Sequence, residues 1–173
     1  MAIFSIGDTV IYGIHGICKI TDIQKRDFMG EIADYFILSP IYDERSTVFV
    51  PCENENLTSK MKRIMSAEEI YEMIRSMPSE QQVWIDSEHE RKKCYAEILK
   101  SGDRKLLIGL IKTLYLHKEK QQASGKKLHI SDENFLRDAE KILYEEFAHV
   151  LQIKREQVLP FICSQIEIQE KNN

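Results

Sequence analysis

The sequence has few cysteines, and they are too far apart to suggest a shared site. The 173 residues hold four of them, with no CxxC pair. This scattering argues against a zinc site, whose cysteines follow short fixed spacings, and against a small disulfide-rich domain. We therefore expect reduced thiols, as in cytosolic proteins. The four are Cys18, Cys52, Cys94 and Cys163.

Long apolar runs are also missing. No stretch approaches the roughly 20 apolar residues that a membrane-spanning helix needs. The first residues, MAIFSIGD, lack the basic and apolar segments of a signal peptide. We therefore expect a cytoplasmic protein with no membrane partner. With 43% hydrophobic and 30% charged residues and no repeats, the composition is that of a globular protein.

Motifs of common catalytic and metal sites are absent as well. The glycine-rich segment 6–20, IGDTVIYGIHGICKI, lacks the lysine and hydroxyl of a phosphate-binding loop and the spacing of GxGxxG. The five histidines are isolated, and no acid is placed to orient His15 toward Cys18 as a catalytic pair. We expect no enzyme activity, catalytic residue, metal ligand, cofactor or small-molecule substrate. His15 is expected to hold the turn between Gly13 and Gly16 by hydrogen bonds.

Charge is present but unevenly distributed, although the net charge is only −4. Residues 86–127 hold eleven basic and six acidic side chains, whereas residues 1–60 hold nine acidic and five basic ones. Segments of opposite charge predict two surfaces with different partners. The basic segment favours contact with nucleic-acid phosphates, with an ordinary solvated face as the alternative.

Residues 1–64 have the pattern of short antiparallel strands. Segments rich in β-branched and aromatic residues are separated by turn signals, and they are DTVIYG, GICKITDIQ, ADYFILS and STVFVP. Alternation in the second predicts two faces, with Ile17, Lys19, Thr21 and Ile23 on one and Cys18, Ile20 and Asp22 on the other. Residues 60–65 supply a closing strand. We predict a small SH3-like or Tudor-like β-barrel.

From residue 65 the apolar period changes from two to 3.6, which predicts an all-α bundle of about five helices. Ser66 and Glu69 form a capping box that begins the first helix. The segment Ser101-Gly102-Asp103 ends the second helix and caps the third. The whole chain is therefore predicted to be α+β in two domains, residues 1–64 and 65–173.

The remaining helices are marked less sharply. Ser131 opens the fourth, and the fifth lies around residues 158–168, where Pro160 fits only near the start of the helix or at a kink. The polar residues 118–127 are interpreted as a loop.

The only tryptophan, Trp84, precedes the second helix in a polar stretch. It is either a hydrophobic staple on that helix or an exposed ring that stacks on a base or wedges into a base step. If the helices form a hairpin, the basic side chains nearby converge. The residues expected to contact DNA are Trp84, Arg91, Lys92, Lys93, Arg104, Lys105, Lys118 and Lys120.

Several of these segments occur together in one known family. They are FSIGDTVIYGIHGICKI at 4–20, Gly30 and Tyr35, TVFVP at 47–51, Ser101-Gly102-Asp103 with the helix over 106–114, and the helix over 139–146. In this order they resemble the CarD, or CdnL, family of bacterial transcription regulators. The N-terminal part is also similar to the polymerase-binding module of transcription-repair coupling factors.

The resemblance implies a Tudor-like domain that docks on the β subunit of RNA polymerase and a helical domain that touches promoter DNA near the upstream edge of the transcription bubble. Such a regulator stabilises the open complex with little sequence specificity, because phosphate contacts are sequence-tolerant. It is cytoplasmic and associates with the nucleoid through polymerase. The residues expected to contact polymerase are Arg26, Val48, Phe49 and Val50.

Three positions depart from the family pattern. The basic position before Val-Pro is Phe49, the family's tryptophan position is Glu88, four residues after Trp84, and its arginine pair is Leu116 and His117. The departures at Trp84, Leu116 and His117 support an alternative function, a protein-protein adaptor on RNA polymerase without direct DNA contact.

Overall fold

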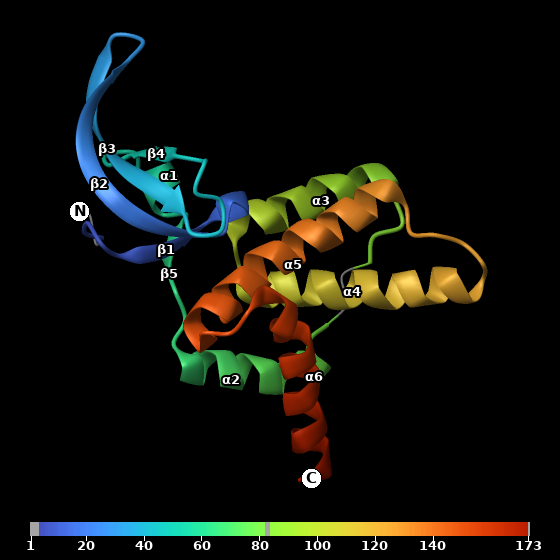
Figure 1. Cartoon of the computed structure of the whole chain (residues 1–173). Coiled ribbons are helices and arrows are strands. Elements are labelled where there is room, and N and C mark those ends of the chain that lie inside the picture. The colour runs from blue at the N-terminus through green and yellow to red at the C-terminus, as the bar shows by residue number, and fades with distance from the viewer. Residues whose placement is uncertain (1–3, 82–83, 173) are drawn as a thin grey trace. The chain divides into compact units, whose positions relative to one another are not determined.

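The computed structural model describes residues 4–81 and 84–172, and the chain divides into two compact units, residues 1–64 and 65–173. Within the described residues the first unit contains a five-stranded antiparallel sheet and the second consists of helices and their connections (Figure 1). The predicted α+β, two-domain fold class is thereby confirmed.

The sheet of the first unit has the strand order β4-β3-β2-β1-β5. Its strands are β1 (Thr9–Tyr12), β2 (Ile17–Phe28), β3 (Glu31–Pro40), β4 (Val48–Pro51) and β5 (Met61–Arg63). The strand predicted within residues 60–65 is present as β5, which pairs with β1 at one edge of the sheet. Figure 1 shows β2 and β3 as a long, curved hairpin whose tip extends beyond the other strands.

One face of this sheet buries the core of the unit. Cross-strand neighbours supply it, since Val10 pairs with Cys18 and Phe36 with Val50, and all four are 0–1% exposed. The other members of the cluster are Ile20, Leu38 and Met61. A short helix, α1 (Glu55–Thr58), contributes Leu57 at its edge.

A β-bulge at Thr21 interrupts the regular alternation of β2. The pairing shifts between Ile20 and Asp22, so Ile20 opposes Leu38 and Asp22 opposes Ile37. A bulge inserts one residue, which moves every later side chain to the other face. The predicted alternation is therefore wrong beyond residue 20, because Asp22 now shares its face with Ile37 and not with Ile20.

The turn between β1 and β2 is a short 3-10 helix, η1 (Gly13–His15). Gly13 and Gly16 have φ of 49° and 67°, a region that glycine adopts without strain. The Tyr12 N–H donates to the Gly16 carbonyl at 2.9 Å, and the His15 ring stacks on Tyr12 with centroids 5.9 Å apart. Cys18 is fully buried, so this segment holds no accessible thiol nucleophile.

The second unit is built from five longer helices and one short 3-10 helix in its described residues. In chain order these are α2 (Ala67–Ser76), η2 (Met77–Ser79), α3 (Glu88–Ser101), α4 (Arg104–Ala123), α5 (Ile130–Leu151) and α6 (Arg155–Lys171). Helix α5 contacts each of the four longer helices around it, and it contributes the buried residues Leu136, Ala139, Leu143 and Phe147.

Local capping signals fix several helix ends as predicted. Ser66 and Glu69 form the capping box of α2, and Asp103 accepts the Leu106 N–H at the start of α4. Gly102 ends α3 in the left-handed region, with φ of 62°. The structure confirms these predicted caps. They could be predicted because each depends on residues only a few positions apart.

Two helix boundaries differ from the prediction. Helix α4 continues to Ala123, so the first part of the segment interpreted as a loop is helical. Residues 118–123 contain good helix formers, and the first glycine after them is Gly125. Helix α6 starts at Arg155, which leaves Pro160 inside the helix. No helix within the described residues is long and apolar enough to cross a membrane.

Candidate functional sites

The outer face of the sheet carries a cluster of aromatic rings beside one arginine. Phe28 makes edge contacts with Tyr35 and Phe49, with ring centroids 5.0 and 5.5 Å apart, and the Arg26 guanidinium carbon lies 6.0 Å from the Phe49 centroid. Phe28 and Phe49 are 44% and 40% exposed. We call Arg26, Phe28, Tyr35 and Phe49 the aromatic cluster. Exposed rings next to a cation suit a protein interface, where aromatic residues and arginine are enriched.

The bulge at Thr21 helps to assemble this cluster. Beyond it, Gln24 opposes Tyr35 and Arg26 opposes Ala33, so these side chains share the outer face. On β4, Phe49 opposes Ile37, which belongs to the same face. One extra residue in β2 therefore brings Arg26 and Phe28 to the side where Phe49 lies.

The four residues predicted to contact polymerase do not share one face. Val50 is fully buried and Val48 packs against the same core cluster, whereas Arg26 and Phe49 face outward. We therefore correct the predicted set by removing Val50, because its side chain is inaccessible, and we leave Val48 as a supporting residue. The alternation of side chains along β4 already predicts that Val48 and Val50 lie on one face and Phe49 on the other. Phe28 and Tyr35 were not predicted from the sequence to contact polymerase.

A hollow with an acidic rim lies beside the aromatic cluster. Tyr35 and Pro51 form part of its wall, and Glu31, Glu53 and Glu55 also line it, in a volume of about 650 Å³. The outer face thus combines apolar rings with several carboxylates. A partner that covers it needs apolar side chains for the rings and basic groups for the carboxylates.

In the helical unit, Arg91 is buried and fully engaged. Its Nε and Nη2 atoms donate to the two carboxylate oxygens of Asp132, each at 3.0 Å, and Nη1 donates to the Ile85 carbonyl at 3.0 Å. The side chains of Arg91 and Asp132 are only 7% and 2% exposed. The prediction that Arg91 contacts DNA is corrected here, because this guanidinium joins α3 to α5 and holds the segment before α3.

Trp84 packs beside that arginine and on α4. Its ring is stacked on His117 with centroids 3.8 Å apart, and the Arg91 guanidinium carbon lies 4.5 Å from its ring centroid. The indole N–H donates to Asp86 at 3.0 Å. Trp84 is partly exposed and borders a hollow of about 660 Å³ with Lys120. Its ring is therefore held by packing and also borders an open hollow.

Arg104 is likewise tied inside the helical unit. Its Nε and Nη2 atoms donate to the Glu146 carboxylate at 2.7 and 2.6 Å, and the Met65 N–H donates to the same carboxylate at 2.9 Å. Glu146 is 1% exposed. Removing one member of such a group leaves a buried charge without its partner. Arg104 is therefore a structural residue, with its charge directed to Glu146 and not to solvent.

The predicted DNA-contacting lysines are exposed or partly exposed, but they do not form one patch. The Trp84–His117 stack holds the segment before α3 against the second half of α4, the part that carries Lys118 and Lys120, and Lys92 and Lys93 lie in the first half of α3. Lys105 lies at the opposite end of this antiparallel pair (Figure 1). We call Lys92, Lys93, Lys118 and Lys120 the lysine surface.

Two titratable groups beside the lysine surface have shifted pKa values. A hydrogen bond from Lys92, 2.6 Å away, lowers the pKa of the Glu88 carboxyl. Burial lowers the pKa of His117, which favours the neutral imidazole against Trp84. Within the described residues no group of three or more His, Cys, Asp and Glu side chains is arranged to hold a metal ion.

Comparison with known protein families gives two matches. Residues 4–65 match the CarD-like/TRCF RID domain, and residues 69–162 match the CarD C-terminal domain. The chain belongs to the CarD family. CarD proteins are non-catalytic transcription regulators that interact with RNA polymerase, and the N-terminal match identifies the polymerase-interacting domain.

Three positions of this chain hold a residue other than the basic one that the resemblance leads us to expect. Phe49, where the resemblance leads us to expect a basic residue, packs on Phe28, and His117, where it leads us to expect arginine, packs on Trp84. Leu116, at the other position where arginine is expected, is 40% exposed. At two positions expected to be basic, this CarD protein therefore has ring contacts. Any cationic role must then rest on other residues.

Proposed function

We propose that this CarD protein binds the β subunit of RNA polymerase through the aromatic cluster and contacts promoter DNA near the upstream edge of the transcription bubble through the lysine surface. It thereby stabilises the open complex with little sequence specificity. The protein performs no chemistry, so its effect comes from binding energy that favours the open over the closed complex.

The aromatic cluster is the observation that carries the polymerase half. Two exposed phenylalanines on a small sheet expose apolar surface that a partner would bury, and Arg26 adds a cation for a carboxylate on that partner. Because three of the four side chains of the aromatic cluster are rings, apolar contact is expected to contribute more than charge. Binding to polymerase is then expected to depend only weakly on salt.

Exposed lysines near Trp84 support the DNA half. Lys92 and Lys93 of α3 and Lys120 of α4 are exposed, and their charges suit phosphates, which carry no sequence information. Trp84 borders the hollow that Lys120 also lines, so a base exposed at the bubble edge would meet an aromatic ring there.

A protein adaptor without DNA contact is the second candidate. It is favoured by the two arginines, Arg91 and Arg104, whose guanidinium groups are paired inside the helical unit. It is also favoured by the stack of Trp84 on His117, which already occupies part of the indole surface.

Open-complex lifetime on a promoter fragment separates the two candidates. We expect Lys92→Glu with Lys93→Glu to shorten the lifetime conferred by the full-length protein severalfold, and to reduce its salt dependence, because two phosphate contacts are lost. The matched control is Lys100→Glu with Lys105→Glu, the same charge change toward the other end of α3 and α4. Equal lifetimes for wild type and the Lys92/Lys93 variant, with polymerase binding retained, would favour the adaptor.

A further inference from the structure

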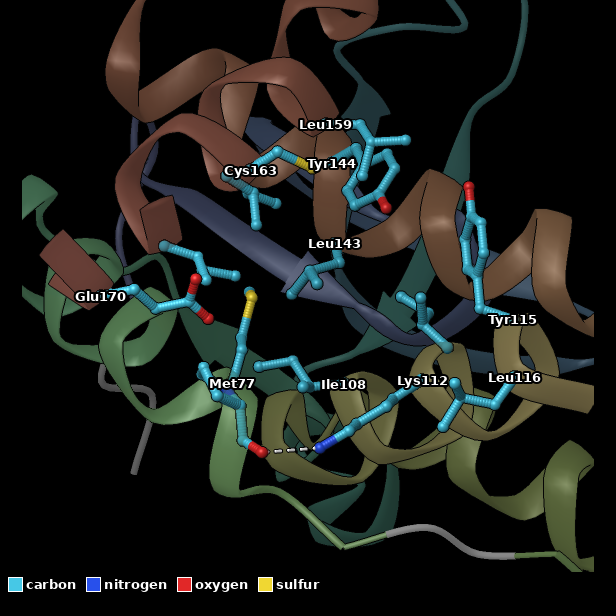
Figure 2. A pocket seen from close by; sticks show the side chains of 14 residues that line it. Met77, Ile108, Lys112, Tyr115, Leu116, Leu143, Tyr144, Leu159, Cys163 and Glu170 are labelled. Carbon is cyan, nitrogen blue, oxygen red and sulfur yellow. Dashed lines mark hydrogen bonds between the residues drawn. The ribbon is translucent and has the colours of Figure 1, made fainter. Parts of the chain in front are cut away.

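An apolar cavity in the helical unit takes no part in either proposed surface. Helices α4 and α6 form its walls, residues Leu143 and Tyr144 of α5 form its floor, and its volume is about 490 Å³ (Figure 2). Cavities of several hundred cubic ångströms with mainly apolar walls are typical of small-molecule sites. Its lining belongs entirely to the second unit.

One end of the cavity is lined by a turn that a lysine holds in place. Met77 and Pro78 of η2 line it there, and the Lys112 ammonium donates to the Pro78 and Glu80 carbonyls at 2.8 and 3.0 Å. Figure 2 shows Lys112 reaching across to this turn. A lysine that satisfies two backbone carbonyls holds η2 against α4, so the wall does not depend on a ligand.

The other end carries two tyrosines, and Figure 2 shows Tyr115 there, away from Met77 and Glu170. The Tyr115 hydroxyl hydrogen-bonds to Glu140. An apolar lining with tyrosine hydroxyls at one end suits a compact molecule that carries one polar group.

Tyr144 supplies a polar group without a partner. The residue is only 8% exposed, its hydroxyl points into the cavity, and it makes no hydrogen bond within the described residues. Burial raises its pKa, so the hydroxyl stays protonated and can donate. A hydroxyl that faces the cavity and has no hydrogen-bond partner in the protein is available to an acceptor on a bound molecule.

We propose that this cavity binds a neutral, mainly apolar small molecule whose hydrogen-bond acceptor is held by the Tyr144 hydroxyl. An anion is disfavoured because Glu170 lines the cavity and Glu140 lies near both tyrosines. Leu116 lines this cavity and also the hollow that contains Trp84 and His117. A bound molecule would therefore touch a residue that borders the proposed DNA-contacting surface.

Nile red, a neutral apolar dye with a carbonyl acceptor, tests the proposal on the full-length protein. We expect saturable binding at one site with enhanced emission. Cys163→Phe, which fills the cavity from α6, should weaken binding at least tenfold, and Tyr144→Phe should weaken it about threefold to tenfold by removing one hydrogen bond. Ser164→Phe is the control, because it adds the same ring at the next, exposed residue of α6, outside the cavity lining.

Absence of saturable binding, or equal loss of affinity in Cys163→Phe and Ser164→Phe, would overturn the proposal. A second measurement needs no variant and holds even if Cys163→Phe fails to fold. Saturating Nile red should slow iodoacetamide labelling of Cys163 in the wild-type protein at least fivefold, as read by mass spectrometry of its peptide. An unchanged labelling rate would contradict the proposed site.

Discussion

Three arginines of this protein, Arg26 in the sheet unit and Arg91 and Arg104 in the helical unit, have opposite roles. In the sheet unit, Arg26 is exposed and lies over Phe49 on the outer face. In the helical unit, Arg91 and Arg104 are turned inward onto Asp132 and Glu146, whereas Lys92 and Lys93, next to Arg91 in the chain, are exposed. Guanidinium groups suit buried bidentate pairs, whereas ammonium groups are strongly hydrated. The comparison teaches that a basic segment does not by itself identify a nucleic-acid surface. Its arginines can be paired inside the fold while the lysines beside them are exposed to solvent.

The largest expected effect tests the inward role of Arg91. We expect Arg91→Ala to lower the free energy of unfolding by about 3–5 kcal/mol, because it leaves the Asp132 carboxylate buried without its partner. Urea denaturation of the full-length protein measures this loss. Lys92→Ala is the neighbouring control and should change stability by no more than about 0.5 kcal/mol. Similar losses in both variants would break the distinction between inward arginine and outward lysine.

A second prediction compares two adjacent residues of β4. Phe49→Ala should weaken binding to the polymerase β subunit about 30-fold, the effect of losing an aromatic anchor worth about 2 kcal/mol, with little loss of stability. Titration of labelled protein with polymerase measures the change. Val50→Ala should lower stability and leave the affinity for polymerase almost unchanged, since Val50 faces the core. Ile14→Ala, an exposed apolar residue of η1, controls for general loss of apolar surface. Unaltered affinity of Phe49→Ala would exclude the aromatic cluster as the docking site.

The smallest expected effect concerns His117 in the helical unit. Its pKa is lowered from 6.5 by burial, so the unfolded chain takes up this proton at a higher pH than the folded one. The stability contributed by the neutral His117 imidazole is therefore complete above pH 6.5 and is lost as the pH falls below 6.5. We expect the free energy of unfolding to decline modestly between pH 7.5 and pH 5.5. His117→Phe, which keeps a ring against Trp84, should show a smaller decline, and an identical decline would contradict this assignment.

The sequence predicted those features that depend on neighbouring residues. The capping box at Ser66 and Glu69 and the turn at Gly102 are encoded within a few positions, and both appear where expected. The bulge at Thr21 was not predictable, because it is fixed by how β2 pairs with β3 and not by β2 alone. It decides which side chains join Phe49, so part of the aromatic cluster was missed with it.

The inward arginines were missed for a related reason. Asp132 is 41 residues from Arg91, and Glu146 is 42 residues from Arg104. No spacing rule links such pairs, and a basic run has the same appearance in sequence whether its charges are solvated or buried. A carboxylate at a position where a helix pattern requires an apolar residue is the available signal, since Glu146 lies between the buried residues Leu143 and Phe147.

The single tryptophan of the chain makes the helical unit optically observable without a label. Trp84 is the only indole, and its ring touches an imidazole on α4 while an arginine from α3 lies over it. Its emission therefore reports on the local polarity at the place where α3 and α4 meet. A shift on mixing with promoter DNA would follow the arrival of the nucleic acid in real time, and the sheet unit, which contains no tryptophan, would contribute no background.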